Sequence, residues 1–238
     1  MNQKEKEPLK QFSLSNREDC IIYLLQIISS MDLCLSRLKE YNKQTEVLIE
    51  KFKKERTENI PYSVYSDLLD KTSGIETYLL NVIGDAQTVS ISYFKYRKLA
   101  ERLVKKGVEG VALTSLNDEI TKYLSDFNRL RNWHNHIPES ILTSELDLIA
   151  PDKISYFLAN PNPIRVHYYS YVSFNFFNSM YSTNKDFYTI AKLLHQAVKR
   201  DYSALIEESV EIKRIYTEKV KNTDQLSATR RSAKIQGL

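Results

Sequence analysis

The sequence predicts an all-α protein, an elongated helical bundle whose first two helices are long. Glycine and proline, which interrupt regular structure, number only five and six in 238 residues, so long elements are favoured. Apolar residues also recur at spacings of three, four and seven. With 42% hydrophobic and 27% charged residues, the chain can bury an ordinary core. We therefore expect one helical domain over residues 16–221, between a flexible segment 1–15 and a flexible basic tail 222–238.

The first helix is expected to begin after a cap at Ser15 or Asn16 and to end at "ENIPYS", where Pro61 disfavours helical geometry before it. Its run "CIIYLLQIISSMDLCL" contains polar residues and is shorter than the roughly 20 apolar residues of a membrane span. We interpret it as a packed face inside a bundle. A heptad-like stripe carries this face and consists of Ile21, Leu24, Ile28, Met31, Leu35, Leu38, Thr45, Leu48 and Phe52.

A second long helix is expected over residues 63–105, with bends at Gly74 and Gly84 and an end at the glycines of "KKGVEG". A third begins near "TSLNDE", where capping and acidic residues cluster, and ends before Pro138. A proline-rich irregular region follows. The chain is then expected to be helical from about 164 to 221, with a turn at "YSTNKD".

Two cysteines and the amino terminus bear on the location of the protein. Cys20 and Cys34 share one predicted helix and lie about 20 Å apart along it, too far to form a disulfide within one chain. The amino terminus has no apolar core typical of a signal peptide. Both observations favour a cytoplasmic protein without a membrane partner.

The overall charge and the absence of known motifs limit the classes of function that the sequence favours. The net charge of +4 permits an anionic partner without indicating a dedicated nucleic-acid binder. The sequence has no phosphate-cradling glycine loop, no Gly-x-Ser-x-Gly elbow and no spaced cysteine quartet. Nucleotide hydrolases, serine hydrolases and zinc fingers are thereby disfavoured.

The stretch "NRLRNWHNHIPES" concentrates polar groups at the end of the third helix. Asn128, Asn132 and His136 lie four residues apart on one face, with Arg131 at its edge, whereas His134 falls on an apolar stripe. Arginine can clamp a phosphate, and histidine moves protons near neutral pH. Metal-free RNA cleavage needs both, since the ribose 2′-hydroxyl is itself the nucleophile. The apolar stripe consists of Ile120, Leu124, Phe127, Leu130, His134 and Ile137.

The segment Arg131–His136 resembles the signature of the HEPN superfamily: an arginine, a polar residue directly after it, and a histidine after four to six intervening positions. The resemblance implies a helical bundle, commonly a homodimer with the motifs facing across a cleft, and a metal-independent ribonuclease without cofactors. It implies a bacterial toxin or antiphage defence role, in which an antitoxin protein can be a partner. Arg131 would bind phosphate, His136 would be catalytic, and Asn132, Asn128 and His134 would support them.

Other interpretations of the same residues stay open. Arg131 and His136 can be solvated cations that offset the negative end of the helix dipole. His134 can be a buried structural histidine. A zinc site is disfavoured because His134 and His136 project about 200° apart on a helix. His167 and His195 are interpreted as ordinary helix residues.

The aromatic-rich segment 166–188 and the first helix suggest further roles. In that segment Phe177 and its neighbours are expected to lie in the core or a dimer interface, and an RNA-stacking platform is the alternative. The long stripe of the first helix suggests a second function class, a noncatalytic helical module for protein–protein interaction. The neighbours meant here are Tyr169, Phe176, Met180 and Tyr181.

Overall fold

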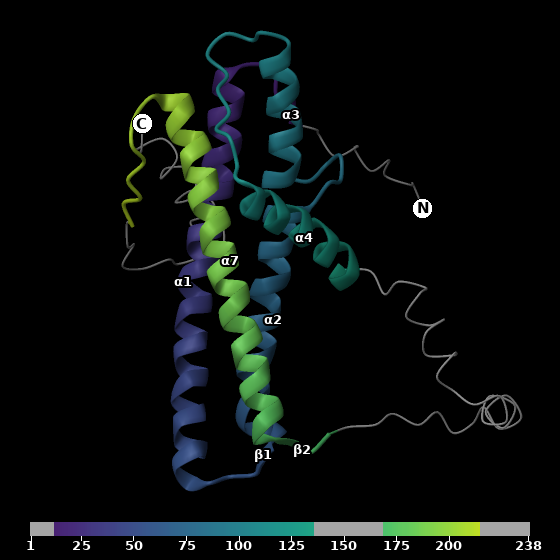
Figure 1. Ribbon diagram of the computed structural model, residues 1–238, viewed down its shortest axis with the longest axis vertical. Coiled ribbons are helices and arrows are strands. Elements are labelled where there is room, and N and C mark those ends of the chain that lie inside the picture. Colours follow the sequence, from purple (N-terminus) through teal and green to yellow (C-terminus); the bar gives the residue numbers. More distant parts are fainter. Residues whose placement is uncertain (1–11, 136–168, 215–238) are drawn as a thin grey trace, which may run out of the picture. The chain divides into compact units, whose positions relative to one another are not determined.

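The computed structural model describes residues 12–135 and 169–214, without the side chains of His134 and Asn135. The chain divides into two compact units, Met1–Glu208 and Ser209–Leu238, and all the helices and strands named here belong to the first. Helices dominate it, which confirms the all-α class, whereas the predicted domain boundary at 221 stays a prediction. The described elements are α1 (Arg17–Glu55), β1 (Asn59–Pro61), α2 (Tyr62–Gly84), α3 (Tyr93–Lys105), α4 (Asp118–Asn135), β2 (Tyr171–Ser173) and α7 (Phe174–Ile206) (Figure 1).

Helix α1 begins where its cap residues predict. The Asn16 side chain accepts a hydrogen bond from the Asp19 backbone N–H at 2.8 Å, and the Asp19 carboxylate accepts one from the Ser15 N–H at 2.9 Å. An 18-residue window of α1 is apolar enough to cross a membrane by length and composition, a property that buried core helices share. Leu24, Met31 and much of the rest of the predicted stripe are indeed buried in the interhelical core.

The prediction of one long helix over residues 63–105 is wrong, because the chain forms two helices, α2 and α3, joined by a loop over 85–92. Asp85 has an extended backbone, and its side chain accepts a hydrogen bond from the Gln87 N–H at 2.9 Å. Ser92 then caps α3 by accepting from the Lys95 N–H at 3.2 Å. These local side-chain bonds compete with helical ones and end the helix.

Strands β1 and β2 pair antiparallel and place the start of α2 next to the start of α7. Ile60 pairs with Val172, and both pack in a core cluster that includes Phe177. Phe177 is therefore in the core as predicted. Tyr169 and Phe176 are not in the core, because 78% and 54% of their surfaces are exposed, and for them a dimer interface stays a prediction.

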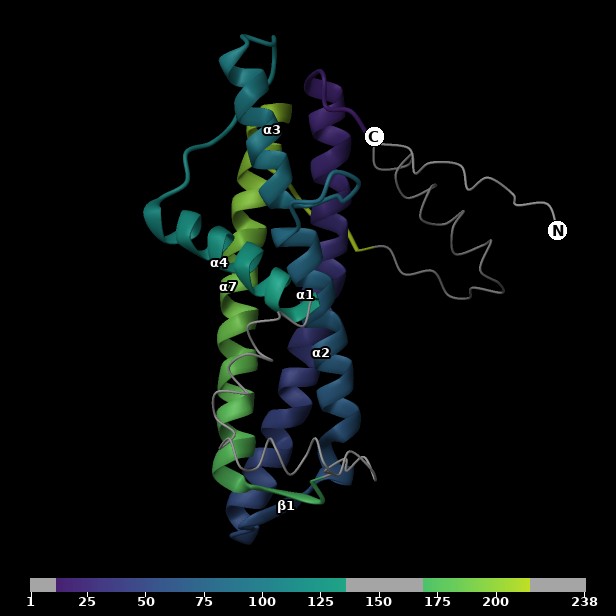
Figure 2. The same ribbon diagram turned by 90° about the vertical axis from the view of Figure 1, so that its right-hand side faces the viewer.

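Helix α7 continues through the turn predicted at "YSTNKD", so that prediction is wrong. The hydroxyls of Thr183 and Thr189 donate to the carbonyls four residues earlier and do not break the helix. Helices α1, α2 and α7 run alongside one another, and α4 crosses α2 and α7 (Figures 1 and 2). The carboxyl end of α4, which carries the candidate motif, is thus held against the end of α2.

Candidate functional site

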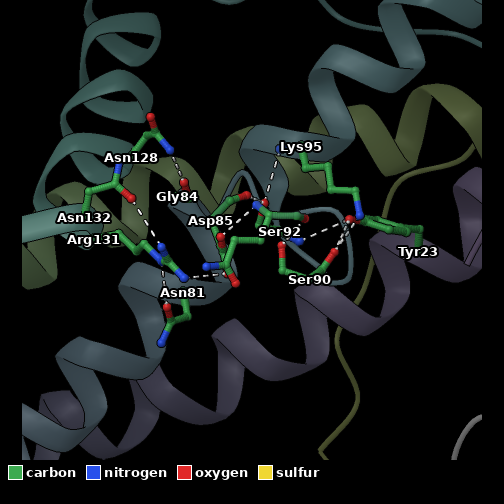
Figure 3. A network of polar contacts seen from close by, with 11 residues as sticks. Tyr23, Asn81, Gly84, Asp85, Ser90, Ser92, Lys95, Asn128, Arg131 and Asn132 are labelled. Atoms are coloured by element: carbon green, nitrogen blue, oxygen red, sulfur yellow. Dashed lines mark hydrogen bonds and ion pairs between the residues drawn. The ribbon is translucent and has the colours of Figure 1, made fainter. Parts of the chain in front are cut away.

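The candidate motif lies at the last turns of α4, next to the end of α2. The structure describes Arg131, Asn132 and Asn128 with their contacts (Figure 3). His136 and the side chain of His134 lie outside the described residues. The candidate histidine and its distance from the arginine therefore stay predictions.

Arg131 is buried, with 7% of its surface exposed, although the helical wheel places it at the edge of a polar face. Leu130 is 46% exposed, although the same wheel places it on the core stripe. The buried face of α4 runs from Leu124 through Phe127, which stacks on Phe187 with ring centroids 5.0 Å apart. Four residues beyond Phe127 the next inward position is Arg131, so this face ends in a charge.

The Arg131 guanidinium donates a hydrogen bond from each of its three nitrogens. Nε donates to Asn81 Oδ1 at 3.2 Å, and Nη2 donates to Asp85 Oδ2 at 3.1 Å in a buried ion pair. Nη1 donates to Oδ1 of the adjacent Asn132 at 3.2 Å. Three directed contacts fix the plane of the guanidinium, and the carboxylate offsets the cost of burying its charge.

Close contact between α2 and α4 makes this pairing possible. A side chain at Gly84 would place its Cβ 2.5 Å from the Phe127 carbonyl oxygen, so only glycine lets the two backbones approach this closely. The Asn128 amide donates to the Gly84 carbonyl at the same point. Asn128 therefore holds α4 on α2 and makes no described contact with Arg131, and its supporting role in catalysis stays a prediction.

Asp85 extends the network to two further helices (Figure 3). Its carbonyl oxygen accepts a hydrogen bond from the Ser92 hydroxyl, and the Ser92 N–H donates to the Tyr23 hydroxyl of α1 at 3.1 Å. Lys95 Nζ donates to the Ser90 carbonyl at 2.9 Å and so holds the 85–92 loop against the first turn of α3. Side chains or backbone from α1, α2, α3 and α4 thus meet around one aspartate.

Sequence reasoning missed Asn81 and Asp85, which hold Arg131 from α2. One signal was available: a buried arginine needs an acidic partner, and Asp85 follows Gly84 directly in a segment rich in turn-forming residues. The signal is usable only once Arg131 is known to be buried.

The chemistry open to this site is the recognition of an anion. A guanidinium carries five N–H groups, of which three donate to described residues, so one on each of Nη1 and Nη2 has no acceptor among the described residues. Those two groups can donate to neighbouring oxygens of one phosphate. Asn132 is exposed beside them, and its amide N–H groups have no acceptor among the described residues.

Two further observations complete the site. His195 is buried in α7, and in the part of the chain that the structure describes no group of three or more His, Cys, Asp or Glu is placed to hold a metal ion.

The chain matches no protein-family model, and neither curated proteins nor solved structures show significant similarity to it.

Proposed function

We propose that this protein is a metal-independent endoribonuclease of the HEPN type. Arg131 binds the scissile phosphate, His136 acts as general acid or base, and Asn132 assists them. The observation that supports this most is the guanidinium at the carboxyl end of α4, oriented by Asp85, Asn81 and Asn132 and five residues before His136 in the sequence.

The proposed reaction needs charge stabilisation and two proton transfers. The ribose 2′-hydroxyl attacks the adjacent phosphorus and displaces the 5′-oxygen of the next nucleotide, which leaves a 2′,3′-cyclic phosphate and a free 5′-hydroxyl. Arg131 stabilises the charge that develops on the phosphate oxygens. A donor that is already oriented does not need to reorganise during the reaction, which is why the contacts of Arg131 matter. His136 takes or supplies a proton at the attacking or leaving oxygen. Two chains are proposed to face each other as a homodimer, in a toxin or antiphage system of the cytoplasm.

A noncatalytic interaction module is the second candidate, and a specific observation favours it. Leu130 and Trp133 lie one turn apart on α4 and are 46% and 53% exposed. Exposed apolar and aromatic side chains at this spacing suit a protein interface. Arg131 would then serve only to hold α4 on α2 through Asp85.

Cleavage of RNA by the purified protein tests the first candidate. We expect wild type to cleave single-stranded RNA in the presence of a chelator. His136→Ala should lower the rate by roughly 10²- to 10⁴-fold, the usual contribution of general acid–base catalysis, with no change in melting temperature. His134→Ala removes an imidazole from the same segment and should lower the cleavage rate much less than His136→Ala, because His134 is proposed only to support the site.

Arg131 needs a separate design because it also stabilises the fold. Arg131→Lys keeps a positive charge near Asp85 but loses the planar set of N–H donors. We therefore expect a large fall in the rate of RNA cleavage and only a small fall in melting temperature. If wild type cleaves no RNA, or His136→Ala cleaves as fast as wild type, the ribonuclease proposal is wrong. Loss of self-association or partner binding in Trp133→Ser would then favour the interaction module.

A further inference from the structure

Helix α3 carries a row of positive charge on the side opposite its buried face. At 100° per residue these cations fall within an arc of about 100°, centred roughly 160–200° from the buried side chains Tyr93, Tyr96 and Ala100. The only acidic residue between 93 and 106 is Glu101. The row, called the α3 stripe below, consists of Lys95, Lys98, Arg102, Lys105 and Lys106.

The inner face of α3 is buried and hydrogen-bonded within the bundle, so the α3 stripe on the opposite face points toward solvent. Tyr93, Tyr96 and Ala100 are fully buried. The Tyr93 hydroxyl donates to the Asp201 carboxylate at 2.8 Å, and Arg97 Nη1 forms an ion pair with the same carboxylate at 2.9 Å. Because Arg97 is neutralised by Asp201 inside the bundle, the exposed positive charge of α3 belongs to the stripe.

Most of the stripe is free to meet an outside anion. Lys98, Arg102 and Lys106 are exposed and form no ion pair with any of the described residues. Lys98 Nζ lies 4.2 Å from the centroid of the Phe94 ring, a cation–π contact that leaves the charge in place. Lys105 pairs with Glu101 at 2.8 Å, an exposed pair of little energetic weight.

The helix dipole does not account for the whole stripe. Cations in the last turn, such as Arg102 and Lys105, offset the negative end of the dipole. Lys98 lies in the first half of α3, where a positive charge gains nothing from the dipole. The dipole therefore does not explain why the row extends along the full length of the helix.

We propose that the α3 stripe binds the phosphate backbone of single-stranded RNA. Lys95 and Lys105 are ten residues apart, about 15 Å along the helix axis, which suits a chain of successive phosphates. A membrane surface fits less well, because the apolar face of α3 is buried and has nothing to insert into lipid. Duplex RNA fits less well too, because its major groove is too narrow for a helix.

The stripe begins next to the candidate site. Lys95 Nζ donates to the Ser90 carbonyl, in the same loop whose first residue, Asp85, holds Arg131. RNA lying along α3 would therefore reach the loop that holds the candidate phosphate-binding arginine. The choice of RNA among polyanions rests on the proposed ribonuclease function, whereas the binding of a phosphodiester chain by the stripe does not.

The test compares two triple variants that remove the same charge. Lys98→Gln with Arg102→Gln and Lys106→Gln neutralises the stripe, and the control variant neutralises three exposed lysines elsewhere. All proteins also carry His136→Ala so that the RNA stays intact. Binding of a fluorescent oligouridine is measured by anisotropy across a salt series, and folding by melting temperature. The control changes are Lys39→Gln, Lys43→Gln and Lys192→Gln.

We expect the stripe variant to bind at least tenfold more weakly and the control variant to bind like the parent. The slope of log K against log salt should decrease by about 0.7 for each lost phosphate contact, hence by about 2 for the triple variant. Equal binding by the stripe variant and the parent, an equal loss in the control, or no binding by the parent would overturn the proposal. Binding only to vesicles containing anionic lipid would overturn it in favour of a membrane surface.

The failure of this proposal is distinguishable from the failure of the proposed function. Cleavage is assayed separately with the native His136 in place. A protein that binds oligouridine through the stripe but cleaves nothing contradicts only the ribonuclease. A protein that cleaves RNA with the same KM in the stripe variant contradicts only the stripe.

Discussion

Replacing Gly84 by alanine tests the contact on which the candidate site depends. The added Cβ would lie 2.5 Å from the Phe127 carbonyl oxygen, 2.6 Å from its carbonyl carbon and 2.7 Å from the Asn128 nitrogen. All three are backbone atoms, so no flexible side chain can move aside. Ordinary contact begins at 3.4 Å, so α2 and α4 would have to separate by about 1 Å.

The energetic cost of that separation follows from the contacts it disturbs. Overpacking by one methyl group costs about 1–3 kcal/mol. The ion pair between Arg131 and Asp85, at 3.1 Å, would also lengthen, and complete loss of a buried pair costs about 3–5 kcal/mol. The better helix propensity of alanine returns less than about 1 kcal/mol. We therefore expect Gly84→Ala to destabilise the fold by about 2–4 kcal/mol, or roughly 5–15 °C in melting temperature.

Gly74→Ala is the matched control, because it makes the same change in the same helix. Gly74 is exposed and nothing lies within 4 Å of the position that an alanine methyl group would occupy there, so only helix propensity changes. It should stabilise the protein by about 1 kcal/mol. Urea denaturation followed by circular dichroism measures both variants. If Gly84→Ala is as stable as wild type, or if both variants shift in the same direction, the close approach of α2 and α4 is not as described.

Two further predictions concern Glu76, which is half-buried, and Asp201, which is fully buried. Burial raises the pKa of the Glu76 carboxyl from 4.5 to about 7, so the folded state binds this proton more tightly and loses stability as the pH rises from about 4.5 to 7. Glu76→Gln should remove that loss and stabilise the fold at pH 8 by up to about 3 kcal/mol, measured by urea unfolding at pH 5 and pH 8; an unchanged pH dependence would contradict it. Asp201→Ala should cost about 3–5 kcal/mol in the same assay, because it leaves Arg97, Tyr93 and Thr114 without their common acceptor, and a cost below 1 kcal/mol would show that this cluster is not coupled.

Local signals account for what the sequence could predict of the fold. The start of α1 follows from Asn16, and that of α4 from Asn117, whose side chain accepts from the Ile120 N–H at 2.9 Å. The break at 85–92 was missed because Val89 and Ile91 extend the helical spacing of apolar residues, yet both are exposed in the loop. The spacing of apolar residues in the sequence does not show which of them are buried. The pairing of β1 with β2 joins segments far apart in sequence, which no local pattern encodes.

The candidate site shows the same limit at the level of one side chain. From Phe127 a helical stripe can continue to Leu130 or to Arg131, and the sequence of α4 alone favours the apolar residue. The choice is made by Asp85, which lies on another helix and offsets the cost of burying the guanidinium. The α3 stripe was missed for a related reason, because a net charge of +4 averages a strongly basic helix with acidic segments elsewhere.

Asp85 connects the two proposed functional features through one residue. Its carboxylate holds Arg131, and its carbonyl holds the Ser92 hydroxyl that caps α3, the helix of the basic stripe. The guanidinium and the first turn of α3 are therefore fixed relative to each other by hydrogen bonds and not by a flexible linker. A strand bound along the stripe would then reach a phosphate-binding group that is already oriented, so little further ordering entropy would oppose the reaction. On this reasoning changes in the stripe should raise KM alone, whereas Asp85→Asn should lower kcat, because it removes the carboxylate that orients Arg131 and keeps the backbone carbonyl that holds Ser92.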